Sequence, residues 1–215
     1  MPTTTVHLVR HGEVHNPEGV LYGRLPGYHL SERGQAMAQR LGQHFSDGTH
    51  DVVVVKASPL MRAQETATPI ATGLGLALGT DERLLEAANH FEGKTFGVGD
   101  GSLRRPQHWP YLVNPFRPSW GEPYREQVAR MHAAVADARD EARGHEAVLV
   151  SHQLPIWEAR LGFEGRRLWH DPRKRQCNLA SVTSFTFDDD GTLLGITVTE
   201  PAADLLPGAS AVAGA

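Results

Sequence analysis

Cysteine and long apolar runs are what this sequence most clearly lacks. Cys177 is the single cysteine among 215 residues, which excludes an intrachain disulfide and a cysteine-based zinc site. No apolar run approaches the ~20 residues that a membrane-spanning helix needs, and the N-terminus lacks the charged-then-apolar pattern of a signal peptide. We therefore expect a cytoplasmic protein with no membrane partner.

Positive charge does not predominate either: the sequence has 21 Lys and Arg residues and 25 Asp and Glu residues, which gives a formal net charge of −4. A net negative chain gives no support for binding nucleic acid or anionic membranes. Histidine, by contrast, is abundant, with 12 residues. Histidine chemistry or a bound metal therefore has to be considered.

Apolar patterning predicts alternating strands and helices. Short apolar and β-branched runs predict strands at residues 4–10, 51–57, 76–80 and 146–151. Apolar residues three and four apart predict helices after Ser31, after Ser58, over 123–143 and over 154–161. This alternation is typical of an α/β fold with a mostly parallel sheet. The chain shows neither repeats nor a linker, so we expect a single domain over residues 1–201.

The remaining segments follow less regular patterns. Residues 87–123 are rich in Gly, Pro and aromatic residues without a period, and we expect them to form a lid or pocket wall. Residues 178–187 alternate like an edge strand, and a turn leads to a returning strand over 193–199. Such edges could pair between subunits, so a homodimer is possible. The Ala/Gly-rich residues 202–215 are expected to be a disordered tail.

The first strand ends in a cation, an imidazole and a glycine: Arg10, His11 and Gly12. In open α/β sheets, ligands bind at the carboxyl edge of the strands. The arginine fork fits a phosphate or carboxylate, and the nearby positive charge disfavours protonation of His11, which leaves a ring nitrogen free to attack. The glycine would let the backbone approach a ligand. Taken alone, such a tripeptide is more often structural.

Two further segments point to the same edge of the sheet. Ser58 and Pro59 predict a helix that starts directly after a strand, with its positive dipole end at this edge. Arg62 lies in the first turn, where a cation is unfavourable unless an anion is bound; a plain surface arginine is the alternative. His152 follows the strand at 146–151 as His11 follows the first strand.

Other candidate ligand contacts come from loops. Asn16, Tyr22, Gly23 and Arg24 lie in a loop expected to pass over the carboxyl edge of the first strand, where they could bind substrate or form only an exposed connection. The basic residues between 164 and 176 form either a solvated face or an anion-attracting rim.

Three segments of the chain carry a resemblance to a known family. Residues 8–13 (LVRHGE), 58–67 (SPLMRAQETA) and 148–152 (VLVSH) resemble the signature segments of the histidine phosphatase superfamily. Gly121-Glu122 and Arg130 also look like family features, and the resemblance runs from about residue 5 to residue 190. It implies the phosphoglycerate mutase-like fold, a three-layer α/β/α sandwich.

The resemblance also implies roles for individual residues. His11 would be the nucleophile that forms a phosphohistidine, and Arg10, Arg62 and His152 would hold the phosphoryl oxygens, without a metal or another cofactor. Glu86 would protonate the leaving oxygen.

Two departures from the family pattern fall near this leaving-group side. Gln153 stands where the family usually has glycine, and Asn89-His90 replace an expected glycine in an interval one residue short. Glu92 and Glu13 therefore stay open as alternative general acids.

The expected function is hydrolysis of a small phosphate ester through the phosphohistidine. Phosphoglycerate mutase-type transfer is the nearest alternative, although Arg104-Arg105-Pro106 is only a faint echo of the mutase insert. A zinc hydrolase built on His11, Glu13 and His15 does not fit, because that motif needs the glutamate directly after the first histidine, on a helix. A non-catalytic phosphate-binding module is a third possibility. No residue in the sequence identifies the substrate.

Overall fold

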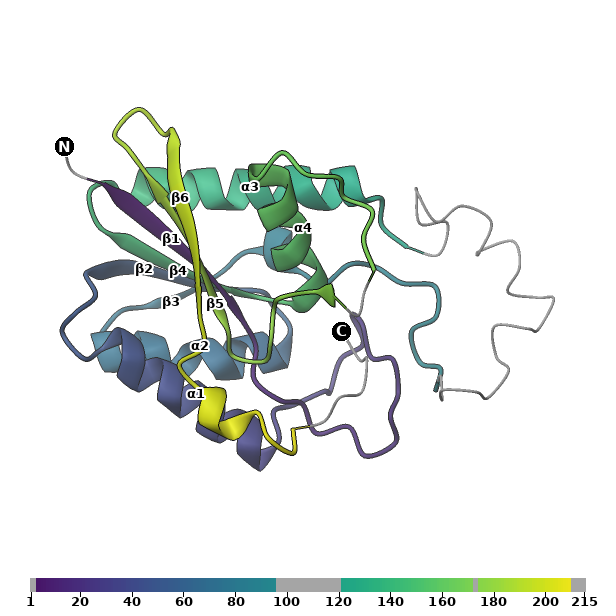
Figure 1. Ribbon diagram of the computed structural model, residues 1–215. Coiled ribbons are helices and arrows are strands. Elements are labelled where there is room, and N and C mark those ends of the chain that lie inside the picture. The colour runs from purple at the N-terminus through teal and green to yellow at the C-terminus, as the bar shows by residue number, and fades with distance from the viewer. Residues whose placement is uncertain (1–2, 96–120, 172–173, 210–215) are drawn as a thin grey trace.

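A six-stranded mixed sheet runs through the middle of the computed structural model, which describes residues 3–95, 121–171 and 174–209 (Figure 1). The strand order is β3-β2-β4-β1-β5-β6. The strands are β1 (Thr4–Arg10), β2 (Val52–Ala57), β3 (Leu78–Thr80), β4 (Glu146–Ser151), β5 (Val182–Phe187) and β6 (Leu193–Thr199). The pairs that join β3, β2, β4 and β1 are parallel, whereas β5 runs antiparallel to both β1 and β6. The expected α/β class with a mostly parallel sheet is confirmed.

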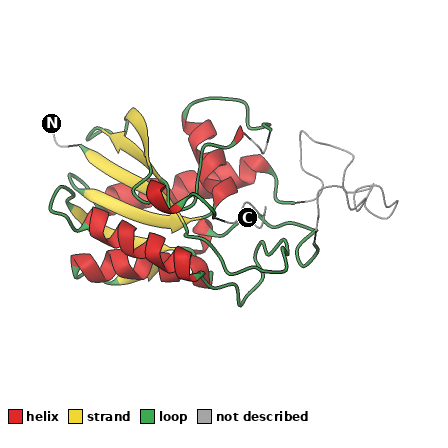
Figure 2. Cartoon of the chain, turned by 60° about the horizontal axis from the view of Figure 1, so that its bottom comes forward, coloured by secondary structure: helices red, strands yellow, loops and turns green. Residues whose placement is uncertain are grey.

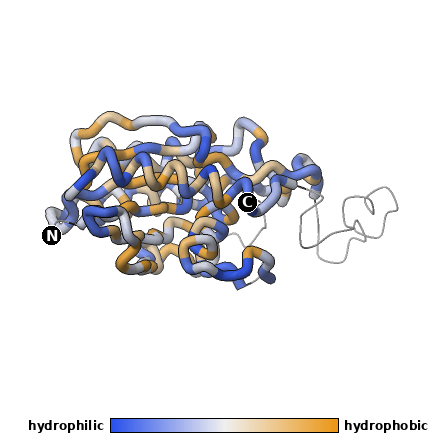
Figure 3. Tube along the Cα trace, turned by 90° about the horizontal axis from the view of Figure 1, so that it is seen from above, coloured by the Kyte–Doolittle hydropathy of each residue, from blue (hydrophilic) through white to orange (hydrophobic). Residues whose placement is uncertain are grey.

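Helices cover both faces of this sheet, so the three-layer arrangement is also confirmed. Figures 1 and 2 show α1 (Glu32–Phe45) and α2 (Met61–Leu74) together on one face, with α3 (Tyr124–Glu141) and α4 (Gln153–Phe163) on the other. Hydrophobic and hydrophilic residues alternate along the helical turns in Figure 3, which gives each helix an apolar stripe to bury.

The two cores follow from the two-residue period of the strands. In β1, Val6 and Leu8 belong to the core under α3 and α4, whereas Val9 belongs to the core under α1 and α2. In β4, Leu149 and Val150 divide between the same two cores. Both faces of these central strands are buried, which is why the sequence reads there as unbroken apolar runs.

The register of β1 against β4 fixes the position of the two sequence motifs. Arg10 pairs with Ser151, and the backbone N–H of His11 donates to the Ser151 carbonyl at 3.1 Å. The next residues along both strands, His11 and His152, therefore leave the sheet side by side at its carboxyl edge.

Gly12 approaches the backbone of α1 closely. A Cβ atom at Gly12 would lie 2.6 Å from the Gly34 carbonyl oxygen, and one at Gly34 would lie 1.9 Å from the Glu13 carbonyl oxygen. The two glycines let α1 pack directly against the backbone that follows His11. The expectation that Gly12 also lets the backbone approach a ligand stays a prediction.

The structure corrects three further expectations. Helix α2 begins at Met61 with Leu60 as its N-cap residue, so Ser58 is not the cap. Strand β5 lies between β1 and β6, not at an edge; the outer strand is β6, and a homodimer formed through it stays a prediction. In the expected tail, a 3-10 turn (η5) occupies Ala203–Leu205 and Ala202 is buried against the core of α1 and α2, so residues 202–209 are folded onto the domain, whereas residues 210–215 lie outside the described part of the chain.

Part of the long excursion at 87–123 lies outside the described residues, so its expected role as a lid stays untested. Residues 87–95 form a loop in which Thr95 bridges to Val20, and Asn89 bridges to Gly121. In the part of the chain that the structure describes, no helix has the length and apolar character needed to cross a membrane.

Candidate active site

His11 is completely buried at the end of β1. Its Nδ1 atom lies 2.7 Å from the Gly12 carbonyl oxygen, which can only accept, so Nδ1 carries the ring proton. Burial, together with the charges of Arg62 and Arg10, holds the pKa of His11 well below its usual value. The imidazole is therefore neutral near pH 7, and its Nε2 lone pair has no hydrogen-bond partner in the described residues.

His152 lies beside His11, with the two ring centroids 5.2 Å apart. Its Nε2 atom is hydrogen-bonded to the Ser58 hydroxyl at 2.8 Å, while Nδ1 is buried and has no partner in the described part of the chain. Burial, followed by the charges of Arg62 and His11, lowers the pKa of His152 well below its usual value. Ser58 thus orients the second histidine. The sequence does not indicate this role, because Ser58-Pro59 is a typical start of a helix.

Two guanidinium groups join the histidines. Arg10 donates from Nη1 to the Cys177 carbonyl at 2.8 Å, and Arg62 donates from Nη2 to the Gly23 carbonyl at 2.6 Å. Each arginine keeps a buried Nε–H for which residues 3–95, 121–171 and 174–209 offer no partner. Arg62 is 1 % exposed, so it is not the surface arginine that the sequence left open.

His11 Nε2, His152 Nδ1 and the Nε atoms of Arg10 and Arg62 are four buried polar atoms with no hydrogen-bond partner among the described residues. Leaving a buried donor or acceptor unpaired costs about 1–3 kcal/mol, and a catalytic role or a bound ion is a common explanation. A tetrahedral oxyanion such as a phosphoryl group would satisfy them all at once. The four residues predicted to enclose a phosphate are brought together here.

Glu86 adds a carboxyl group to the same region. It is 3 % exposed; Oε1 accepts from the Ala87 N–H at 2.8 Å, and Oε2 is buried without a partner among the described residues. Burial raises the pKa of Glu86 above its usual value, against the opposing effects of the Ala87 N–H and of the charges on Arg62, Arg175 and Arg10. A raised pKa is the direction that suits a carboxyl group to act as a general acid.

The two alternative acids differ in their surroundings. Glu13 accepts from the Ser31 hydroxyl at 2.5 Å, and that hydroxyl in turn caps α1 by accepting from the Gly34 N–H. Glu92 accepts from the Asn89 N–H at 3.1 Å, but it also lies beside the site: a Cβ atom at Gly23 would be 2.4 Å from its Oε1 atom, and its charge opposes the lowering of the Arg62 pKa by burial. Glu86 is buried whereas Glu92 is partly exposed, and Glu86 as the general acid stays a prediction.

The predicted loop contacts divide into two groups. The Tyr22 ring lies under the Arg62 guanidinium, with 4.7 Å between the guanidinium carbon and the ring centroid, and the neighbouring Gly23 carbonyl accepts from the same arginine. Asn16 closes its own turn, through two hydrogen bonds with the Val20 backbone at 2.8 and 3.0 Å. Tyr22 and Gly23 thus reach the site, whereas the Asn16 side chain is occupied locally.

Arg24 holds the backbone of Glu86 in place. Its Nε atom donates to the Glu86 carbonyl at 2.6 Å, and Nη2 donates to the Glu122 carboxylate at 2.9 Å. Arg130 binds the same carboxylate through two nitrogens, at 2.7 and 3.0 Å. This group of charges fixes the backbone of Glu86, which makes Arg24 a positioning residue in this structure.

Arg175 is the main residue that sequence reasoning did not single out. Its Nε atom donates to His170 Nε2 at 2.8 Å. His170 Nδ1 faces the Leu168 carbonyl at 2.8 Å and the fully buried Glu158 carboxylate at 3.2 Å. Arg175 is close enough to Glu86 to affect the pKa of that carboxyl. The basic run at 164–176 is the feature of the sequence that could have indicated this residue. Of that run, Arg175 is the member that lies near Glu86.

Gln153, the departure from the family pattern, holds this segment in place. Its side-chain amide donates to the Cys177 carbonyl at 3.2 Å, and its oxygen accepts from Arg175 Nη1 at 3.3 Å. A glycine at this position could make neither contact. Asn89 likewise accepts from the Phe91 N–H at 3.0 Å and shapes the shortened loop after Glu86.

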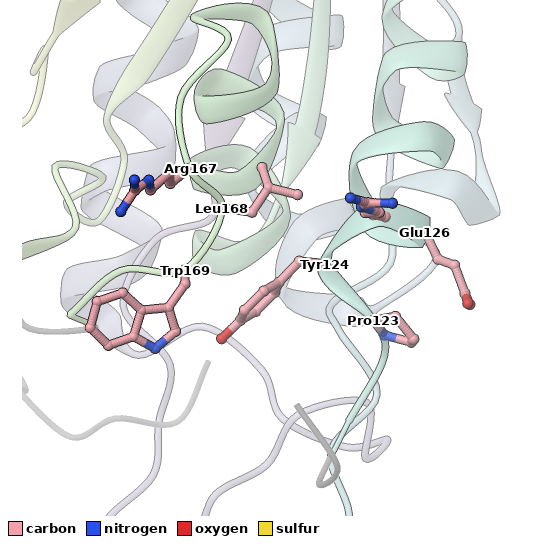
Figure 4. A pocket seen from close by; sticks show the side chains of 7 residues that line it. Pro123, Tyr124, Glu126, Arg167, Leu168 and Trp169 are labelled. Carbon is pink, nitrogen blue, oxygen red and sulfur yellow. The ribbon is translucent and has the colours of Figure 1, made fainter. Parts of the chain in front are cut away.

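A cavity of about 620 Å³ opens beside this arrangement, between the start of α3 and residues 167–169. Figure 4 shows the Tyr124 and Trp169 side chains turned toward each other across it. The Tyr124 ring centroid lies 6.1 Å from that of His170. Through this ring contact the cavity borders His170, which accepts a hydrogen bond from Arg175.

Comparisons with known proteins agree with this geometry. A family model described as histidine phosphatase superfamily (branch 1) matches residues 6–197. The uncharacterized protein Rv0525 of Mycobacterium tuberculosis is 57% identical over 200 residues, covering 93% of this chain and 98% of that protein. A probable phosphoglycerate mutase, GpmB, of Salmonella paratyphi C is 28% identical and covers 93% of each chain.

A solved structure confirms the fold. Phosphoserine phosphatase from Entamoeba histolytica, in complex with 3-phosphoglyceric acid, superimposes with a TM-score of 0.74 at 22% identity, covering 93% of this chain and 99% of that one. The expected phosphoglycerate mutase-like architecture is therefore established.

The two buried histidines should make stability depend on pH. A histidine whose pKa is lower in the folded state adds stability that is fully present above the ordinary pKa of about 6.5 and is lost as the pH falls below it, because the unfolded chain then binds more protons. We expect the free energy of unfolding, measured by urea denaturation, to fall less steeply between about pH 7 and pH 5 in His11→Gln/His152→Gln than in the native protein. His15→Gln, which removes an exposed imidazole, should keep the native slope. Equal slopes in all three proteins would contradict the lowered pKa values.

Proposed function

Since the chain belongs to the histidine phosphatase superfamily, as the match over residues 6–197 shows, we propose that it hydrolyses a small phosphate monoester through a phosphohistidine on His11. The cluster of buried, unpartnered polar atoms on His11, His152, Arg10, Arg62 and Glu86 is the observation that carries this proposal. The coarser assignment, a phosphatase or mutase, follows from the family and its relatives.

The proposed reaction has two steps. In the first, His11 Nε2 attacks phosphorus, the bond from phosphorus to the ester oxygen breaks, and Glu86 gives its proton to that oxygen. The guanidinium groups and His152 stabilise the charge on the three phosphoryl oxygens. In the second step, Glu86 takes a proton from water, the water oxygen attacks phosphorus, and His11 is released. Each step balances without a further reactant.

Phosphoryl transfer back to a bound intermediate, as in a mutase, uses the same first step. One relative is described as a probable phosphoglycerate mutase, so this alternative is tested together with hydrolysis. The residues that echoed a mutase insert, Arg104-Arg105-Pro106, lie outside the described residues. Hydrolysis and transfer differ only in what accepts the phosphoryl group.

We further propose that the substrate carries a second acidic group. Arg10, Arg62 and the two histidines suffice for three phosphoryl oxygens, whereas Arg175 lies near Glu86, on the side from which the leaving group departs. A carboxylate or a second phosphate there would pair with its guanidinium. The phosphatase of similar fold was solved with 3-phosphoglyceric acid, which bears a carboxylate.

Replacement of His11 should abolish turnover. His11→Ala is expected to lower kcat for an aryl phosphate by more than about 10³-fold, because no other group in the site can form the covalent intermediate. The native protein, quenched with alkali after brief exposure to labelled substrate, should carry base-stable, acid-labile phosphate. With 3-phosphoglycerate, which has a second hydroxyl to receive the phosphoryl group, release of inorganic phosphate identifies a hydrolase, whereas conversion to 2-phosphoglycerate without phosphate release identifies a mutase and overturns the proposal.

Replacement of Glu86 should depend on the leaving group. Glu86→Gln is expected to lower kcat for an alkyl phosphate by about 10²–10⁴-fold, and to affect p-nitrophenyl phosphate much less, because nitrophenolate leaves without protonation. Glu92→Gln is the matched control and should leave the ratio of the two rates unchanged. If the leaving-group effect appears in Glu92→Gln and not in Glu86→Gln, then Glu92 is the general acid and the assignment to Glu86 is wrong.

Replacement of Arg175 should affect substrates selectively. Arg175→Met is expected to reduce kcat/KM about 10–100-fold for phosphoserine or 3-phosphoglycerate, with little change for p-nitrophenyl phosphate. Arg175→Lys should restore part of the loss, and Arg166→Met, which removes an exposed arginine paired with Glu164, should change neither substrate. An equal loss for both substrates would show that Arg175 only supports the fold of the site.

A further inference from the structure

A second group of titratable side chains lies at the opposite end of the sheet from His11. His7 is in β1, Glu146 is the first residue of β4, and His50 is in the loop before β2. His7 precedes His11 by four residues along one strand, or ~13 Å. Among the described residues, these three form the group whose possible metal-ligand atoms all lie within 4.8 Å of one another.

The separations within this group match those around a metal ion. His7 Nε2 lies 3.0 Å from Glu146 Oε2, and His50 Nδ1 lies 2.8 Å from the same oxygen. With bonds of about 2.0–2.1 Å to zinc, neighbouring ligand atoms of a tetrahedral site are roughly 3.3 Å apart. Two imidazoles that converge on one carboxylate oxygen are thus already close to the spacing that a shared cation imposes.

The surroundings also prepare His7 to act as a ligand. The His7 side chain is 5% exposed, and its other ring nitrogen, Nδ1, is hydrogen-bonded to the Ser184 hydroxyl at 2.8 Å. In this structure Nε2 donates to Glu146, because a carboxylate oxygen only accepts. A hydroxyl either donates or accepts, so on metal binding Ser184 could accept a proton from Nδ1, which would free the Nε2 lone pair for the ion. Metal-binding histidines commonly have their second nitrogen fixed in this way.

A fourth imidazole lies next to the group. The His44 ring, in the last turn of α1, has its centroid 4.7 Å from that of His50, and both rings contact Phe45 at about 5 Å. Imidazole and carboxylate ligands suit zinc and neighbouring divalent metals. The cluster therefore has the ligand types, spacing and partial burial of a small metal site.

We propose that His7, His50 and Glu146 bind a divalent transition metal ion such as zinc, with His44 or water as the fourth ligand. The ion would join the starts of β1 and β4 to the loop before β2, so its role is structural. This site is separate from the phosphoryl-binding residues and takes no part in the proposed hydrolysis. Without a metal, the same groups form only a hydrogen-bonded cluster around Glu146, and that is the outcome the experiment must exclude.

The test uses the tag-free, full-length protein, stripped of metal by chelation and then titrated with Zn²⁺. We expect one Zn²⁺ ion per chain in calorimetry, and a rise in Tm of about 5–10 °C with Zn²⁺ ~100-fold above its Kd. Substituted Co²⁺ should show the visible absorption of a tetrahedral site. His50→Gln should weaken binding at least ~10-fold and so reduce the rise in Tm by about half or more at the same Zn²⁺ concentration. Ser184→Ala should weaken binding ~10-fold through its contact with His7.

Two control variants locate the bound ion. His145→Gln removes a neighbouring imidazole that pairs with the exposed Asp51 and lies outside the cluster, and His11→Ala removes a ring of the buried histidine pair. Both should keep the native affinity for Zn²⁺. The proposal is overturned if the native protein takes up no Zn²⁺, if His11→Ala or His145→Gln loses binding, or if His50→Gln binds as the native protein does. Phosphatase activity of His50→Gln should be native, so failure here and failure of the proposed function are distinguishable.

Discussion

The parallel register between β1 and β4 is the constraint on which the site depends. It places two histidines, each one residue beyond its strand, on adjacent chains at one edge of the sheet. Because the strands are buried on both faces, the imidazoles leave them in a region from which water is largely excluded. Histidines with lowered pKa values, a carboxyl group with a raised pKa, and N–H groups that are unpaired among the described residues are all consequences of this placement.

Burial of unpaired polar groups costs free energy. Each of these side chains also has one hydrogen bond to the protein, formed by an atom other than the unpaired one, and this bond holds it in place. The Gly12, Cys177 and Gly23 carbonyls accept from His11, Arg10 and Arg62, respectively. Backbone atoms are the partners in all three cases, so the fold itself fixes the directions of these side chains. The charges that gather on Glu122 do the same for the backbone of Glu86. Each reactive group is thus held in place before a substrate arrives.

Much of the fold and the centre of the site could be predicted from sequence, because strands with two buried faces produce apolar runs that end abruptly at His11 and His152. What could not be predicted depends on contacts between distant segments. In the sequence Ser58 has the pattern of a helix cap, and no neighbouring residue indicates its hydrogen bond to His152. Arg175 has the same residue type as its exposed neighbours, and only its contacts with His170 and Gln153 distinguish it. Residues 202–209 have no periodic pattern of their own, and their apolar side chains are buried only by contact with the core of α1 and α2. This is why the sequence predicts disorder there.

The reversed direction of β5 has a consequence for how this scaffold diversifies. Because β5 runs antiparallel to β1, the chain that enters it, including Arg175 and Cys177, is delivered to the same edge as the histidines. That entering segment is a connection outside the sheet, and only one of its ends is tied to a strand. Evolution or a protein engineer can therefore vary its length and charge to retune substrate choice, while the chemistry anchored in the parallel strands is inherited unchanged.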